Sequence, residues 1–191
     1  MTTKVNITKT DLLSDKKFTL KNYEYDLTHN GTTISKKTEV YFRPDAVAVL
    51  LYDIDNETFI LTSQFRLPGY LNGVADGYVI EACAGLIDEG ETAESTAIRE
   101  VEEETGYSVT AIEKVGEAFS SVGGIPEKLH LFIAAYTEDM KTGEGGGLEN
   151  ENEQVELVKI SFAEARQKLK EGLFNDMKTI LLLQHFFLYK I

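Results

Sequence analysis

Cysteine is almost absent from this chain of 191 residues, in which Cys83 is the only one. A single thiol cannot form a disulfide within the chain or supply a cysteine-based zinc site. Small apolar residues flank Cys83, so we expect it to be buried in the core. One free thiol suits a reducing compartment, and the composition excludes a disulfide-stabilised secreted domain.

Basic residues are scarce. The chain has 19 Lys and Arg against 32 Asp and Glu, which gives a formal net charge of −13. Such a chain repels the phosphates of DNA and RNA, so a nucleic-acid partner is not expected. An acidic protein can nevertheless bind phosphates when a divalent cation lies between the two sets of negative charges.

Long apolar runs are also lacking. The longest, such as Ala46–Leu51 and Ile180–Leu183, are far too short to span a bilayer. Residues Met1–Leu13 alternate polar and apolar side chains and lack the apolar stretch of a signal peptide. We therefore expect a soluble cytoplasmic protein without a membrane partner.

Strand patterns dominate the first part of the chain. Alternating or continuous apolar residues, separated by turn residues, predict a series of strands. The His29-Asn30-Gly31 turn predicts a hairpin between the first two. The expected strands are Phe18–Leu27, Thr32–Phe42, Ala46–Tyr52, Thr58–Phe65, Tyr78–Cys83, Val109–Phe119, Leu129–Tyr136 and Val155–Ile160.

Three helices are expected between and after these strands. The clearest is Thr92–Thr105, which ends at Gly106, a natural C-cap. Ser161 and Glu164 form a capping-box pattern that opens a helix to Lys170. A final helix covers Lys178–Tyr189, and Thr142–Asn152 forms a loop rich in glycine and acidic residues. The pattern predicts an α+β domain, residues 44–191, preceded by a β-rich segment, residues 1–43.

Acidic residues cluster on one face of the first predicted helix. At about 100° per residue, Glu100, Glu103 and Glu104 fall within roughly 100° of one another, whereas Glu102 points elsewhere. Three like charges destabilise a helix unless something positive binds them. Mg²⁺ takes carboxylate oxygens and, commonly, substrate phosphate oxygens. The alternative interpretation is a solvated acidic face.

Spacing decides between these two interpretations. Gly85–Tyr107 matches G-x5-E-x7-R-E-U-x-E-E-x-G-U at every fixed position, where U is a bulky apolar residue and Tyr107 takes the last place. This stretch resembles the Nudix box. The resemblance implies a Nudix fold, an α/β/α sandwich with a mixed sheet, and a hydrolase that acts on phosphorus anhydrides.

The resemblance extends over nearly the whole chain to one branch, the nucleotide-sugar pyrophosphatases related to ADP-ribose hydrolases. It is strongest to the bacterial GDP-mannose pyrophosphatases. The matching pieces include Gln64-Phe-Arg66, Glu81-Ala-Cys-Ala-Gly85, Gly145-Gly-Gly147 and Lys178-Thr-x-Leu-Leu-Leu183. The branch implies hydrolysis of GDP-mannose to GMP and mannose 1-phosphate, with ADP-ribose or an ADP-sugar as the alternative substrate. Val122 stands where ADP-ribose hydrolases usually have proline.

The resemblance also implies roles for individual residues. Metal ligands are expected at Glu100, Glu104 and the backbone carbonyl of Ala84, with Mg²⁺ as the cofactor and Mn²⁺ as a substitute. Glu103 joins them as metal ligand and catalytic residue, and Arg99 orients a carboxylate; Glu91 reaches the same site. The substrate-binding residues are Arg66, Lys37, Glu39, Glu127 and Lys178, with Lys37 and Glu39 coming from the partner chain of a homodimer.

A further glutamate from the loop before the last strand is expected to act as base or metal ligand. Counting back from Val155–Ile160 selects Glu153, whereas counting forward from Gly147 selects Glu151. We favour Glu153 because strand register is less elastic than a loop. Two other classes of protein stay open here: a nucleotide-sugar sensor without catalysis, and an acidic interaction domain.

Overall fold

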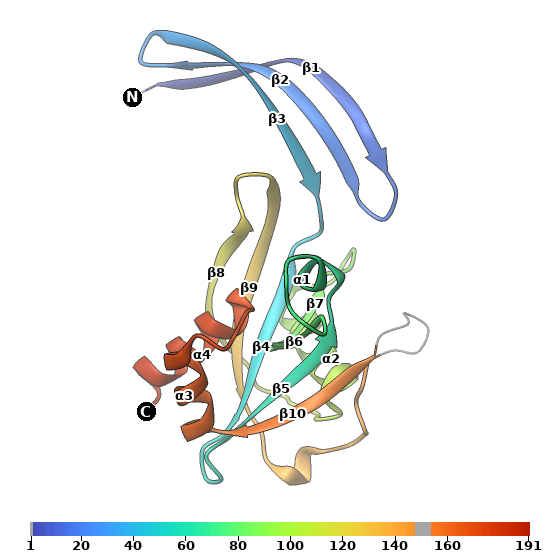
Figure 1. The fold of residues 1–191 in the computed structure, drawn as a ribbon, viewed down its shortest axis with the longest axis vertical. Helices are drawn as coiled ribbons and strands as arrows, with labels where there is room; N and C mark the ends of the chain where they lie inside the picture. Colours follow the sequence, from blue (N-terminus) through green and yellow to red (C-terminus); the bar gives the residue numbers. More distant parts are fainter. Residues whose placement is uncertain (1, 148–153) are drawn as a thin grey trace. The chain divides into compact units, whose positions relative to one another are not determined.

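The computed structural model describes residues 2–147 and 154–191. The chain divides into two compact units (Figure 1). The first comprises Met1–Asp45 and Ala118–Leu129, and the second comprises Ala46–Glu117 and His130–Ile191. No helix in the described part of the chain is long and apolar enough to cross a membrane.

The first unit contains a three-stranded antiparallel sheet in the order β1-β2-β3. The strands are β1 (Thr3–Asp15), β2 (Thr19–His29) and β3 (Thr32–Phe42). The predicted hairpin is confirmed: His29 pairs with Thr32, and the two turn residues Asn30 and Gly31 have φ of 49° and 82°. Positive φ at both positions is the reason that Asn-Gly favours this turn.

Strand β1 was not predicted from the sequence. The alternation noted in Met1–Leu13 does not keep one register through the strand, because the pairing with β2 shifts between Ile7 and Lys9 and again between Leu12 and Ser14. A bulge moves the following side chains to the other face, so no single period of two runs through the whole of β1.

The second sheet is larger and mixed, and most of it belongs to the second unit. The parts of β8 and β9 that fall within Ala118–Leu129 are assigned to the first unit. The path of this larger sheet is β10-β5-β4-β9-β8, with β6 paired to β5 and β7 paired to β4. The strands are β4 (Ala46–Asp53), β5 (Thr58–Phe65), β6 (Tyr78–Glu81), β7 (Cys83–Leu86), β8 (Glu113–Ser121), β9 (Ile125–Ala135) and β10 (Val155–Ser161). The predicted strand Tyr78–Cys83 is thus two short strands with different partners.

The helices of the second unit match the predicted three, with one addition. They are α1 (Leu67–Leu71), α2 (Ala93–Thr105), α3 (Phe162–Glu171) and α4 (Met177–Tyr189), and a 3-10 turn covers Glu138–Met140. The short α1 was not predicted, because one turn containing Pro68 and Gly69 carries no helical period.

Both faces of the central strand β4 are buried, which explains its continuous apolar run. On one face, Val47 and Val49 join a core cluster that includes Val101 of α2. On the other face, Tyr52 packs against Phe186 of α4 with ring centroids 4.9 Å apart. The expected α/β/α layering is therefore present, and Cys83 is buried in the α2-side core as predicted.

Candidate active site

Helix α2 holds the predicted acidic face in a fixed register. Thr92 caps its N-terminus: the hydroxyl of Thr92 accepts from the backbone N–H of Ser95 at 3.1 Å, and the Ser95 hydroxyl accepts from the N–H of Thr92 at 3.0 Å. Gly106 ends the helix with φ of 72°. Ala97 and Val101, on the adjoining stripe of the helix, are buried in the core cluster with residues of the sheet. Together these features fix which way each glutamate points.

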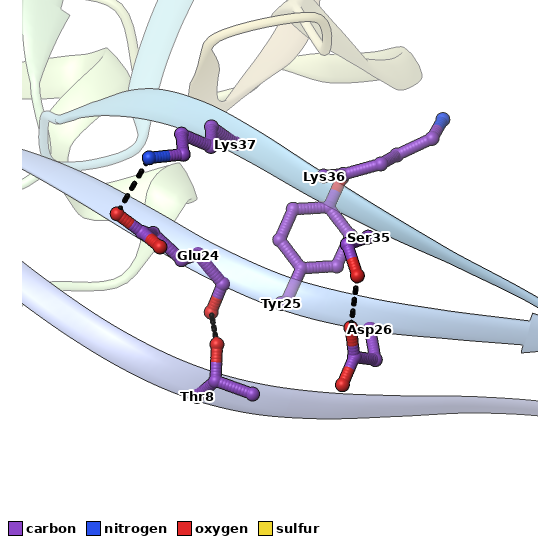
Figure 2. Close-up of a pocket in the computed structure, with 7 residues that line it drawn as sticks. All are labelled: Thr8, Glu24, Tyr25, Asp26, Ser35, Lys36 and Lys37. Atoms are coloured by element: carbon purple, nitrogen blue, oxygen red, sulfur yellow. Dashed lines mark hydrogen bonds and ion pairs between the residues drawn. The ribbon is translucent and has the colours of Figure 1, made fainter.

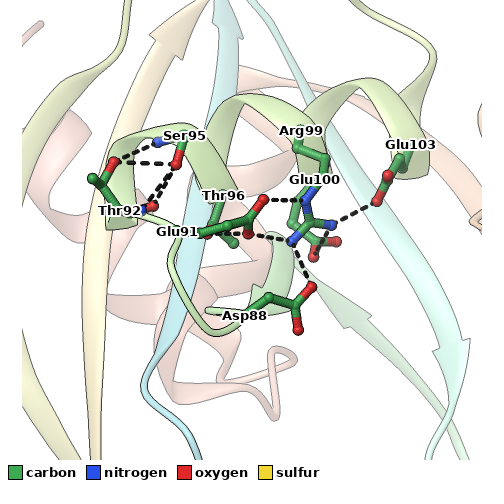
Figure 3. Close-up of polar contacts among 8 residues, drawn as sticks. All are labelled: Asp88, Glu91, Thr92, Ser95, Thr96, Arg99, Glu100 and Glu103. Atoms are coloured by element: carbon green, nitrogen blue, oxygen red, sulfur yellow. Dashed lines mark hydrogen bonds and ion pairs between the residues drawn. The ribbon is translucent and has the colours of Figure 1, made fainter.

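Arg99 lies at the centre of the acidic face (Figure 3). Its Nη1 donates to Glu100 at 2.9 Å and to Glu103 at 2.8 Å, while Nε and Nη2 donate to the two oxygens of Glu91 at 3.1 and 2.9 Å. We call Glu91, Arg99, Glu100 and Glu103 the Arg99 cluster. One guanidinium against three carboxylates leaves a formal charge of −2.

The electrostatics of the cluster favour its ionised form. Hydrogen bonds from Arg99, and then from Thr96, lower the pKa of Glu91 to about 2. The hydrogen bond to Glu91 is the largest influence on Arg99 and raises the pKa of its guanidinium further. The Glu91 carboxylate therefore stays charged at neutral pH, and a charged carboxylate is the form that binds a metal ion.

Two glutamates of α2 lie close to the backbone of strand β7. A Cβ atom added to Gly85 would lie 1.9 Å from Oε1 of Glu100, so only glycine permits this approach. The buried Glu104 accepts a hydrogen bond from the N–H of Ala84 at 3.1 Å. Three of the predicted metal ligands, namely Ala84, Glu100 and Glu104, thus lie together. Their oxygens are the hard donors that Mg²⁺ prefers, so this donor set fits the ion.

The carboxylates do not converge on a single point, however. Among residues 2–147 and 154–191, no three His, Cys, Asp or Glu side chains are arranged as a set that would hold a metal ion. The fourth predicted ligand, Glu103, is hydrogen-bonded to Arg99 instead. Binding a metal ion would therefore require rotation of side chains that now contact Arg99.

A second charged cluster lies in the same unit, at the end of β6. Glu81, which is 4% exposed, accepts from Nε of Arg66 at 2.7 Å, from its Nη2 at 3.0 Å and from Nζ of Lys178 at 3.2 Å. Lys178 also donates to Asp176 at 2.6 Å. We call Arg66, Glu81, Asp176 and Lys178 the Glu81 cluster.

The start of α4 supplies half of the Glu81 cluster. Asp176 caps α4 by accepting from the N–H of Thr179 at 2.9 Å, and the Thr179 hydroxyl accepts from the N–H of Ala82 at 2.7 Å. Burial lowers the pKa of Lys178, but the charges of Asp176 and Glu81 outweigh it and raise that pKa overall. The structure thus brings together Arg66 and Lys178, which were predicted to bind substrate. The acids that hold them, Glu81 and Asp176, were not predicted.

The other predicted substrate-binding residues belong to the first unit. Lys37 lines a hollow of about 200 Å³ on the three-stranded sheet and pairs with Glu24 at 2.8 Å (Figure 2). Glu39 is exposed on β3. Glu127 is 4% exposed and pairs with Arg43 at 3.3 Å. Lys37 and Glu127 therefore each form an ion pair within their own unit, and the side chain of Glu39 is exposed.

The chain around the predicted loop glutamate is anchored to α2. The N–H of Gly146 donates to the carbonyl of Glu104 at 2.8 Å, and that of Gly147 donates to Glu103 at 3.2 Å. The carbonyl of Gly146 in turn accepts from the N–H of Val155 at 3.2 Å. The two alternatives for the loop glutamate, Glu151 and Glu153, lie outside the described residues.

Comparison with known families identifies the chain. A model of the NUDIX domain matches residues 42–185. The chain belongs to the Nudix family. A model described as the GDP-mannose pyrophosphatase NudK N-terminal domain matches residues 4–41, so the Nudix domain and the segment before it are both assigned. The chain is accordingly a Nudix hydrolase.

Individual relatives cover almost all of this Nudix protein. A GDP-mannose pyrophosphatase of Cronobacter sakazakii is 45% identical over 97% of this chain and 96% of its own length. Those of Pectobacterium atrosepticum and Escherichia coli K12 are 42% and 40% identical over the same share of this chain and cover 95% and 96% of their own lengths. A crystal structure of an ADP compounds hydrolase superposes with a TM-score of 0.72 at 20% identity, covering 97% of this chain and 94% of that one, which confirms the Nudix fold.

Proposed function

We propose that this chain hydrolyses GDP-mannose to GMP and mannose 1-phosphate with the help of a divalent metal ion. Most support for this substrate comes from the N-terminal segment. Residues 4–41, outside the Nudix domain itself, match the N-terminal domain of a GDP-mannose pyrophosphatase. The near-complete alignment with three enzymes of that name adds to it.

The Arg99 cluster and the Glu81 cluster suit the two charged species of this reaction, a metal ion and the substrate phosphates. Nudix hydrolases generally use divalent ions such as Mg²⁺. Glu100, Glu104 and the carbonyl of Ala84 would hold such an ion, with Glu103 as a further ligand and Mn²⁺ as a substitute. The chemistry that the ion supplies is neutralisation of pyrophosphate charge and activation of water. Arg99 orients Glu100 and Glu103 through its hydrogen bonds to both carboxylates.

The reaction itself is a transfer of a phosphoryl group to water. Water adds to one phosphorus, the bridging P–O bond breaks, and the products are GMP and mannose 1-phosphate. Glu153, or alternatively Glu151, takes the proton of the attacking water. Arg66 and Lys178 hold the phosphates for attack, since charged donors bind phosphate oxygens strongly. Lys37 and Glu39 would reach the nucleotide from the partner chain of a homodimer, and Glu127 would also bind the substrate.

We further propose that the chain acts as a homodimer through residues 1–43. One face of the three-stranded sheet carries a row of three apolar side chains, Val5, Leu27 and Ile34, which pair across the strands. Val5 and Ile34 are 59% and 47% exposed. The next row on the other face, Asn6, Asp26 and Ser35, is polar. An apolar sheet face is stable when another layer covers it.

Light scattering coupled to gel filtration tests this assembly. The wild-type chain is expected to elute at twice the monomer mass, and Val5→Asp at the monomer mass. Asn6→Asp is the matched control, because it adds the same charge one residue away on the polar face, and it should stay dimeric. A monomeric wild type, or a dimer that survives Val5→Asp, would contradict the proposal.

Product analysis is the decisive test of the activity. The protein is incubated with Mg²⁺ and, separately, GDP-mannose, ADP-ribose or ADP-glucose. We expect GMP and mannose 1-phosphate to form fastest from GDP-mannose and nothing to form in EDTA. Faster cleavage of ADP-ribose would assign the chain to the other branch. Tight binding of GDP-mannose without turnover would instead indicate a sensor.

A further inference from the structure

Glu81 has no role in the chemistry described so far, although it lies at the centre of the cluster that is proposed to bind phosphate. It is one of few buried acids, and both of its oxygens face cations. Arg66 is 15 residues away in sequence and Lys178 is 97 residues away. One carboxylate thus ties together the end of β5, the end of β6 and the start of α4.

Burying a carboxylate is unfavourable unless cations and hydrogen bonds compensate it. Here the compensation is bidentate: Nε and Nη2 of Arg66 contact the two different oxygens of Glu81. Such a fork fixes the plane of a guanidinium as well as its position. The Arg66 side chain is still 41% exposed, so part of this positively charged side chain remains accessible from solvent.

Arg66 and Lys178 are both long side chains with many rotamers, and Glu81 restricts both of them. Arginine and lysine lose substantial rotamer entropy when they are ordered, and a ligand that has to order them binds more weakly. Lys178 has a second partner, Asp176, whereas the bidentate contact of Arg66 is with Glu81. Loss of Glu81 would remove the bidentate contact of Arg66 and leave Lys178 its contact with Asp176.

We propose that Glu81 is a positioning residue, which pre-orients Arg66 and Lys178 to receive the two phosphates of the substrate. The proposal rests on the proposed function, because it takes the pyrophosphate as the anion that these cations bind. Glu81 itself touches neither the substrate nor the reacting atoms.

A role in charge balance alone leads to the opposite expectation. If Glu81 only neutralised its two neighbours, replacing it by glutamine would leave the cluster more positive and would tighten the binding of an anion. If Glu81 positions them, the same replacement loosens binding in spite of the added positive charge. The sign of the change in affinity therefore distinguishes the two roles.

The test measures binding of GDP-mannose by calorimetry in EDTA, which prevents turnover, for wild type, Glu81→Gln, Arg66→Ala and the double variant. We expect Glu81→Gln to raise Kd by about tenfold. The double variant should bind only slightly more weakly than Arg66→Ala alone, because the bidentate contact of Glu81 is with Arg66 and Asp176 still holds Lys178. Glu81→Asp, which keeps the charge, should restore part of the affinity. In the Mg²⁺-dependent assay, Glu81→Gln should raise KM more than it lowers kcat.

Glu138→Gln is the matched control. It makes the same change at another ion-paired glutamate of the second unit, whose partner is Lys159, and it should leave Kd unchanged. Tighter or unchanged binding in Glu81→Gln, or additive losses in the double variant, would overturn the proposal. If Glu81→Gln does not fold, Glu81→Asp alone carries the comparison, with weaker binding expected and wild-type binding contradicting it.

The outcome also separates this inference from the proposed function. A wild type that does not cleave GDP-mannose refutes the function. In that case the same variants are compared with inorganic pyrophosphate, and weaker binding in Glu81→Gln than in wild type would still support the role of Glu81. Equal binding in the two proteins would refute that role as well.

Discussion

The Arg99 cluster and the Glu81 cluster are built from the same kinds of charged group in different proportions. In the first, one arginine lies among three carboxylates on α2 and the turn before it. In the second, two cations and two carboxylates balance, and the acids lie on the inner side with side-chain exposures of 6% and 12%. The first has an excess of negative charge, whereas in the second Glu81 is buried, Asp176 is mostly covered and the Arg66 side chain remains partly exposed.

This difference indicates what each cluster would bind. Surplus carboxylates on a helix are stabilised by a divalent cation, and a partly exposed arginine held by a buried acid is prepared for an anion. A metal-dependent pyrophosphatase needs both functions, because its substrate carries negative charge that an acidic chain would otherwise repel. The two clusters should therefore respond differently to mutation.

The largest effect is expected from Glu104→Gln. The change keeps the size of this buried side chain but removes the charge that lies against the backbone of Ala84. We expect kcat to fall by about 10²–10³-fold, as for the loss of a central electrostatic group. Steady-state kinetics at saturating Mg²⁺ measures this, and circular dichroism checks the fold. Glu102→Gln, on the exposed side of the same helix, is the control; wild-type kcat in Glu104→Gln would remove α2 from the mechanism.

An intermediate effect is expected from Arg66→Ala, and it should differ in kind. KM for the nucleotide sugar should rise about tenfold, whereas the Mg²⁺ concentration for half-maximal activity should not change. Glu100→Gln should show the reverse, with a higher Mg²⁺ requirement and an unchanged KM at saturating Mg²⁺. Titrations of substrate and metal on both variants measure the two parameters.

Arg166→Ala is a control for the loss of an arginine in that experiment. Its guanidinium stacks on Phe187, with 4.4 Å between Cζ and the ring centroid, and belongs to neither cluster. If Arg66→Ala and Glu100→Gln changed the same parameter, the division of labour between the clusters would be wrong.

The smallest effect is expected from Tyr107→Phe, which lies outside both clusters. Burial, and then the hydrogen bond to Glu138, raises the pKa of Tyr107 to about 12. A raised pKa in the folded state gives stability that is present below pH 10, the value in the unfolded chain, and is lost as pH rises toward 12. Phenylalanine removes this dependence.

Thermal unfolding between pH 7 and pH 12 measures that effect. At pH 7 the melting temperature should fall by a few degrees, since a typical hydrogen bond contributes about 1 kcal/mol. Between pH 10 and pH 12 the variant should lose stability less steeply than wild type, while kcat and KM at neutral pH stay the same. Altered kinetics would extend the functional site beyond the two clusters.

The sequence predicts the Arg99 cluster far better than the Glu81 cluster. The residues of the first lie within one helix and the turn before it, so their spacing alone places Glu100, Glu103 and Glu104 on one face. The members of the second are brought together by long-range strand and helix packing. Resemblance to a family indicated Arg66 and Lys178, but not the acid between them. A signal was nevertheless present, since Glu81 stands at the end of a strand that leads directly into the buried Ala82 and Cys83.

The secondary structure shows the same limit. Strong local patterns predicted β4, α2 and the β2–β3 hairpin. Strand β1 was missed because its bulges break the period, and α1 because a single turn has no period. Where Tyr78–Cys83 was expected as one strand, the chain changes partner from β5 to β4, which no local pattern encodes.

Gly146 has a consequence for how this protein can vary during evolution. Its N–H donates to a carbonyl in the last turn of α2, and its own carbonyl accepts from the N–H of Val155. Gly146 therefore links the end of α2 to the start of β10. A side chain at this position is disfavoured, because the backbone of Gly146 has φ of 102°. We therefore expect glycine to be kept here wherever this link between the acidic helix and the sheet is kept.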